Sequence, residues 1–186
     1  GADLVSYFDD ANGVSVNLAT GTATDGGGLT DTLTGVENAS GSAFGDTLVA
    51  AASGSLLLGN GGIDIIGGGD GDDSLFGGDG TDTITGGLGN DSMSGGAGND
   101  SMQGLGGDDT LDGGAGVDTL DGSAGIDTAI FSFNAGPMII DLVAGTAFDS
   151  IAGETDVVLQ IENVVGSGAA DTITGDGADN VLDGGA

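Results

Sequence analysis

Apolar residues recur at every ninth position along the middle of the chain, in most repeats between two polar residues. From Gly59 the sequence divides without a gap into eight nine-residue units: GNGGIDIIG, GGDGDDSLF, GGDGTDTIT, GGLGNDSMS, GGAGNDSMQ, GLGGDDTLD, GGAGVDTLD and GSAGIDTAI. Position eight is Ile, Leu, Met or, once, Ala, whereas position six is always aspartate and position four always glycine. Such regular spacing predicts a repeated structural unit with one inward side chain per repeat.

The two halves of each unit predict different local structures. In the last three residues, such as T-I-T or S-M-S, an apolar side chain alternates with its neighbours, which is typical of a short strand with its middle side chain buried. The glycine-rich first half suits a turn with positive φ angles, where a Cβ would clash. The pattern therefore predicts strand, turn, strand, turn.

These units resemble the RTX nonapeptide G-G-x-G-x-D-x-U-x, in which U is a large apolar residue, a calcium-binding repeat of the parallel β-helix type. The resemblance implies an all-β fold: a parallel β-roll, a β-helix-like solenoid. In such a roll six residues of each unit form a turn, three form a strand, and two units complete one coil. The resemblance also implies that the position-six carboxylate binds calcium together with turn carbonyls at positions two and four.

The aspartates raise an electrostatic problem that a cation would solve. If two units form a coil, aspartates eighteen residues apart stack in two rows, one with residues 64, 82, 100 and 118 and the other with 73, 91, 109 and 127. Carboxylates about 5 Å apart repel by about 3 kcal/mol at an effective dielectric near 20. Calcium accepts six to eight oxygen ligands, backbone carbonyls included, in flexible geometry. We therefore expect multiple Ca²⁺ ions between the coils, and a metal-free chain that is unfolded or nearly so.

The candidate calcium ligands are the position-six aspartates and the glycines at positions two and four. The aspartates are Asp3, Asp46, Asp64, Asp73, Asp82, Asp91, Asp100, Asp109, Asp118, Asp127 and Asp171. The glycines are Gly62, Gly69, Gly71, Gly78, Gly80, Gly87, Gly89, Gly96, Gly98, Gly107, Gly114 and Gly116.

Composition narrows the function further. Thirty acidic residues face no Lys, Arg or His, which gives a formal charge of −30. We therefore expect neither nucleic-acid binding nor membrane insertion, because the chain has no basic patch and no apolar run of membrane-spanning length. The absence of Cys leaves oxygen ligands for a metal. Without His, Cys, Lys or Arg, catalysis would have to use carboxylates and hydroxyls alone, so we expect no enzyme activity in this chain.

A longer repeat surrounds the short one. VSVNLATGTATD at 14–25 matches MIIDLVAGTAFD at 138–149, and VENASGSAFGDTL at 36–48 matches IENVVGSGAADTI at 161–173. We predict a β spacer over 1–40 that continues the solenoid, a roll over 41–130 that is most regular over 59–130, a second spacer over 131–165, and the start of a second roll over 166–186. The last three residues followed by the first six would read GGAGADLVS, another nonapeptide, which suggests head-to-tail continuation with neighbouring copies or adjoining repeats.

The leading interpretation is a calcium-binding structural repeat of a secreted or cell-surface bacterial protein. By its resemblance to RTX proteins exported through type I secretion, it would fold on calcium binding outside the cell, as part of a long array, surface layer or fibre. Two alternatives stay open: an accessory module of a secreted enzyme, such as a protease or polysaccharide-modifying enzyme, and an adhesin stalk. A solvated Gly/Ser/Asp linker would not need the apolar residue at position eight.

Overall fold

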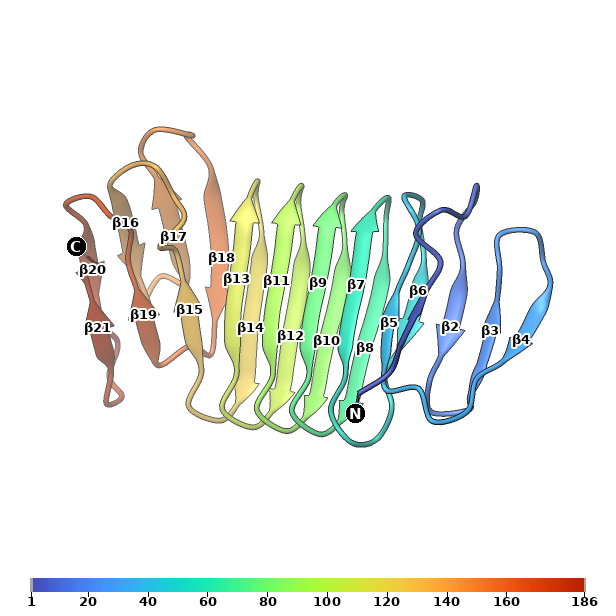
Figure 1. Ribbon diagram of the computed structural model, residues 1–186. Coiled ribbons are helices and arrows are strands. Elements are labelled where there is room, and N and C mark those ends of the chain that lie inside the picture. Colours follow the sequence, from blue (N-terminus) through green and yellow to red (C-terminus); the bar gives the residue numbers. More distant parts are fainter. Residues whose placement is uncertain (1, 186) are drawn as a thin grey trace.

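The position-eight side chains fill one continuous slot between two facing sheets. The computed structural model describes residues 2–185, in which every regular element is a β-strand. Leu57, Leu75, Met93 and Leu111 from one sheet meet Ile66, Ile84, Met102 and Leu120 from the other, and none of these side chains is more than 2 % exposed. The strands stack in a row, from the blue hairpin strands at one end to the red strands at the other (Figure 1). The predicted all-β solenoid is therefore confirmed.

Nine strands form the first sheet. In spatial order they are β1 (Leu4–Ser6), β5 (Asn38–Ser40), β7 (Leu56–Gly61), β9 (Ser74–Asp79), β11 (Ser92–Ala97), β13 (Thr110–Ala115), β15 (Thr128–Ile130), β19 (Asn163–Val165) and β21 (Val181–Asp183). All of their pairings are parallel.

Twelve strands form the second sheet. In spatial order they are β20 (Thr172–Thr174), β16 (Met138–Asp141), β17 (Thr146–Asp149), β18 (Thr155–Leu159), β14 (Thr119–Ala124), β12 (Ser101–Gly106), β10 (Thr83–Leu88), β8 (Ile65–Asp70), β6 (Thr47–Val49), β2 (Ser15–Asn17), β3 (Thr22–Thr24) and β4 (Thr30–Thr32).

Two nonapeptides complete one coil, as predicted. The pairing of β10 with β12 sets Ile84 opposite Met102, and that of β9 with β11 sets Leu75 opposite Met93, so equivalent residues lie eighteen positions apart. Successive units alternate between the two sheets. In each unit the position-six aspartate directly precedes a strand.

The paired segments are longer than predicted. Strands from β7 to β14 have six residues instead of three, because pairing continues through the first three positions of the next unit. The register of β10 with β12, for example, continues to Gly87 opposite Leu105. Glycines in these positions let the backbones of adjacent coils approach closely and pair while the chain is already turning.

The spacers interrupt the parallel roll with antiparallel strands. β2, β3 and β4 form one meander, and β16, β17 and β18 form its counterpart. After each meander the chain returns to the first sheet, through β5 and β19 respectively. Each spacer therefore has three antiparallel strands.

Matching hydrogen bonds confirm that the longer repeat is structural. The amide of Val14 donates to Asp46 Oδ1 at 2.7 Å, and the equivalent amide of Met138 donates to Asp171 Oδ1 at 2.8 Å. The junction suggested by GGAGADLVS includes Gly1 and Ala186, which lie outside the described residues.

Candidate metal centre

The position-six aspartates form two buried rows, one along each edge of the roll. Each precedes a strand whose apolar residue points into the core, and the eight side chains from Asp64 to Asp127 are 0–3 % exposed. All eight aspartates make the same hydrogen bond. Oδ1 accepts the amide N–H of the equivalent residue in the preceding coil, at 2.6–2.9 Å. The side chains thus connect coil to coil along the solenoid axis.

The second oxygen of each carboxylate has no partner in the described chain. Oδ2 is buried and without a hydrogen bond in Asp64, Asp73, Asp82, Asp91, Asp100, Asp109, Asp118 and Asp127. A carboxylate oxygen can only accept, so each one needs a proton donor or a cation. These eight unsatisfied oxygens all occupy the same position of the repeat, so they need one common explanation, and a row of cation ligands supplies it.

Backbone carbonyls face the same spaces. A Cβ on Gly77, at position one, would lie within 2.5 Å of both Asp82 Oδ2 and the Gly95 carbonyl oxygen of the next coil. A Cβ on Gly80, at position four, would lie within 3.0 Å of both the Gly62 carbonyl oxygen and Asp82 Oδ1. Only glycine lets carboxylate and carbonyl oxygens come this close to the turn backbone, and the polar atoms gathered there are oxygens. An all-oxygen donor set of this kind suits calcium.

The position-two glycines lie in the second halves of the six-residue strands and the position-four glycines in the turns that follow, with carbonyls of both close to the next coil. The Gly78 carbonyl oxygen, for example, lies where a Cβ on Gly96 would stand. The position-one carbonyls, such as that of Gly95, face the unpartnered Oδ2 atoms more directly and were missed. A sequence motif gives the position of each glycine but does not show which backbone carbonyl points toward the neighbouring coil.

Burial raises the pKa of these carboxyl groups. The pKa of Asp64 rises to about 7, and those of Asp73, Asp100, Asp118 and Asp127 rise to about 6. The pKa values of Asp82, Asp91 and Asp109 also rise. In each case loss of hydration is the largest cause, the hydrogen bond from the preceding coil opposes it, and repulsion between carboxylates is smaller where it contributes. The sequence argument assigned most of the free-energy cost of stacking ionised carboxylates to their mutual repulsion, whereas in the structure most of that cost comes from loss of hydration.

The outlying predicted aspartates differ from the eight in the rows. Asp46 is buried, but its oxygens already accept hydrogen bonds from the amide and hydroxyl of Ser42 and the amide of Val14. Asp171 makes the same bonds with Ser167 and Met138. Asp3 is exposed. The structure thus groups eight of the eleven predicted aspartates into one repeating arrangement.

Two further acids end the rows, and both lie in the spacer. Asp156 Oδ1 accepts the amide of Asp118, and Glu162 Oε2 accepts the amide of Asp127, each at 2.9 Å. Neither fits the nonapeptide spacing, so the motif missed them. For Glu162 the sequence did contain a signal, the duplicated V/I-E-N triplet, which includes Glu37 in the first copy.

Within residues 2–185 no three acidic side chains converge as a conventional metal cluster. Each site would instead combine carboxylates of adjacent coils with turn carbonyls. Comparison with protein families agrees with this geometry: the model of the RTX calcium-binding nonapeptide repeat, which covers four copies, matches residues 58–93, 94–129 and 161–186.

The chain belongs to the RTX calcium-binding nonapeptide repeat family. The matches cover more than half of its length, and they confirm the predicted resemblance. Calcium is accordingly its cofactor, bound at multiple sites, and the chain is a calcium-binding β-roll that acts as a structural module. A search of curated proteins gives no match.

Proposed function

We propose that this RTX segment is a calcium-dependent structural repeat that folds when it meets extracellular calcium. The observation that carries the proposal is the set of eight buried, unpartnered Oδ2 atoms, because their desolvation opposes folding until cations occupy the rows. The ligands we assign are the position-six aspartates from Asp64 to Asp127, together with turn carbonyls at positions one, two and four.

Export would then be coupled to folding. RTX repeat proteins are generally secreted by type I secretion, and extracellular calcium modules bind with Kd values of roughly 10⁻⁴ to 10⁻³ M. A chain of this affinity stays unfolded where calcium is scarce and folds where calcium reaches about millimolar levels. We propose a secreted or cell-surface location on this basis. No helix in residues 2–185 has the length and apolar character needed to span a membrane.

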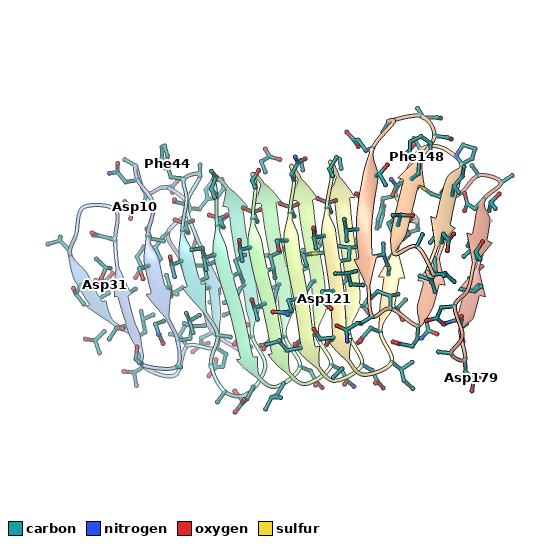
Figure 2. All side chains as sticks on the ribbon, turned by 180° about the vertical axis from the view of Figure 1, so that it is seen from behind. Asp10, Asp31, Phe44, Asp121, Phe148 and Asp179 are labelled. Carbon is teal, nitrogen blue, oxygen red and sulfur yellow. The ribbon has the colours of Figure 1, made fainter. Side chains whose placement is uncertain are left out.

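Neighbouring repeats of the same kind are the partners that fit the strand edges. β1 and β4 at one end, and β20 and β21 at the other, each pair on one side only within the described chain. Figure 2 shows Asp31 of β4 and Asp179, in the turn before β21, at opposite ends of the stack. The equivalents of β4 and β1 in the second copy are β18 and β15, and these pair on their other sides with β14 and β13. We propose that spacers and rolls alternate along a longer array, spacers over 1–40 and 131–165 and rolls over 41–130 and from 166.

A calcium titration followed by far-UV circular dichroism and light scattering tests both parts of the proposal. We expect β signal to appear cooperatively as calcium rises and to vanish when chelator is added, while magnesium at the same concentration has little effect. An increase in scattering that accompanies folding would support assembly into arrays, and a folded chain that stays monomeric would contradict it. Full β signal in chelator at neutral pH would contradict the calcium requirement itself.

A further inference from the structure

The end of the second spacer folds as a shortened coil. β18 pairs with β14 so that Val158 lies opposite Leu120, and β19 pairs with β15 so that Val164 lies opposite Ala129. Val158 and Val164 are at most 2 % exposed and occupy the apolar slot. This segment contains no nonapeptide, yet its two strands continue both sheets in register.

Its turn is half the usual length and contains a glutamate where a nonapeptide has aspartate. The inward residues Leu120 and Ala129 of the preceding coil stand nine positions apart, whereas Val158 and Val164 stand only six apart. The segment between the three-residue strand cores therefore shrinks from the six residues 122–127 to the three residues 160–162. Gln160 has a φ of 50°, a left-handed conformation that is rare for a residue with a side chain and that tightens the turn. The longer side chain of Glu162 still reaches the Asp127 amide, at 2.9 Å.

The oxygens around Asp127 reproduce those inside the rows. A Cβ on Gly104 would meet Asp109 Oδ2 together with the Gly122 carbonyl oxygen of the next coil. A Cβ on Gly122 would meet Asp127 Oδ2 together with the Gln160 carbonyl oxygen. Gln160 therefore supplies, from the spacer, the carbonyl that position-one glycines supply elsewhere.

Asp127 Oδ2 is the independent sign that a ligand is required there. Asp127 is fully buried, and this oxygen has no hydrogen-bond partner, like those of the seven other aspartates in the rows. If calcium lay only between successive nonapeptides, the last carboxylate of the row would meet no second acid on its outer side. Glu162 is the acid that stands there.

We infer that Asp127, Glu162 and the Gln160 carbonyl form a further calcium site, which joins the spacer to the roll. The inference rests on the proposed calcium-dependent folding of the rows and extends it beyond the nonapeptide repeat. Calcium at this site fastens β18 and β19 onto the last coil. The spacer is therefore folded by the same cation as the roll it follows.

The first copy of the longer repeat preserves the acid, the amide bond and the left-handed turn, whereas its aspartate, Asp3, is exposed. The Asp3 amide donates to Glu37 Oε2 at 2.9 Å, and Gly35, with a φ of 65°, stands where the second copy has Gln160. The third segment that the family model matches begins at Ile161 and therefore includes Glu162. The bond between this acid and this amide therefore recurs in both copies, and the buried aspartate that completes the site is present in the second.

The test counts bound calcium on the full chain by equilibrium dialysis at saturating calcium. Glu162→Gln keeps an oxygen that can accept the Asp127 amide but removes the charge, so we expect it to bind one calcium ion fewer than the wild type. Asp127→Asn affects the sites on both of its sides and should bind two fewer, and the double variant should lose no more than Asp127→Asn alone. Asp9→Asn makes an equal charge change at an exposed residue whose side chain has no hydrogen bond within residues 2–185, and it should leave the count unchanged.

A second measurement covers a variant that folds poorly. Hydrogen exchange of the β18 and β19 amides in saturating calcium should be at least about tenfold faster in Glu162→Gln, while the β10 and β12 amides stay protected. The inference is overturned if Glu162→Gln binds as many ions as the wild type, or if Asp127→Asn loses only one. A wild-type chain that binds no calcium, or is fully folded without it, would instead overturn the proposed function.

Discussion

Acid should replace calcium as the agent that folds this chain. In chelator at pH 7.5 the row aspartates are ionised when solvated, and burying them opposes folding. As the pH falls, the buried groups take up protons before the unfolded chain does, because their pKa values in the fold, about 7 for Asp64 and about 6 for Asp73, Asp100, Asp118 and Asp127, lie above the ordinary value of 3.8. The folded state then binds more protons than the unfolded state, so its stability rises as the pH falls.

The size of the effect follows from these five groups. A tenfold change in acidity corresponds to about 1.4 kcal/mol. Summed over the five groups and reduced by half for solvent screening in the turns, the stabilisation on full protonation is on the order of 8 kcal/mol, of which about half is present at pH 5. A domain of this size is stable by about 5 to 15 kcal/mol in total, so the change is large enough to decide whether the metal-free chain folds. The stabilisation is fully present below the unfolded pKa and is lost as the pH rises through 6 to 7.

The assay is far-UV circular dichroism in chelator from pH 7.5 to pH 5, above the isoelectric point of about 4.1. We expect β signal to grow below pH 7 and the calcium midpoint to rise over the same range, because protons compete for the same oxygens. Sodium chloride at pH 7.5 is the control, since it screens the net charge of −30 without protonating the rows. A chain that stays unfolded at pH 5, or that salt folds equally well, would refute carboxylate desolvation as the cause.

Two further substitutions test the packing of the coil, each by calcium midpoint and thermal melting in calcium. Gly98→Ala places a methyl group on the Gly80 carbonyl oxygen at a φ of 134°, and we expect a loss of at least about 2 kcal/mol, whereas Gly67→Ala, where the space is open, should cost less than about 0.5 kcal/mol. Leu111→Ala removes a fully buried side chain from the slot and should cost about 2 to 5 kcal/mol, whereas Leu88→Ala, 63 % exposed, should be nearly neutral. Equal effects within either pair would contradict the roles assigned to the turn or the slot.

The roll was predictable because its rules repeat. One apolar residue per unit defines the slot, and one aspartate per unit defines the rows, so an error in one unit cannot shift the others. The extent of backbone pairing was not predictable in the same way. Gly87 pairs with Leu105 through the backbone alone, and side-chain periodicity contains no information about such a contact.

The spacer acids were hidden for a different reason. Asp156 and Glu162 stand six residues apart, whereas nonapeptide aspartates stand nine apart. A three-residue turn and a longer side chain compensate for each other, so that Glu162 arrives at the position that the motif reserves for aspartate. Only coordinates, or comparison with Glu37 in the first copy, can reveal that a change in turn length has replaced the regular spacing.

Each row aspartate belongs to two coils at once, and this sharing determines how the chain folds. Oδ1 of Asp100 accepts the amide of Asp82 in the coil before, while its Oδ2 is left for a cation next to the carbonyl of the coil after. Binding at one site therefore orders the turn that forms half of the next site. In a solenoid, where each coil contacts only its neighbours, such coupling makes calcium binding cooperative along the axis. A cap that supplies its own acid, as Glu162 does, completes the last site and prevents this order from fraying at the junction with the spacer.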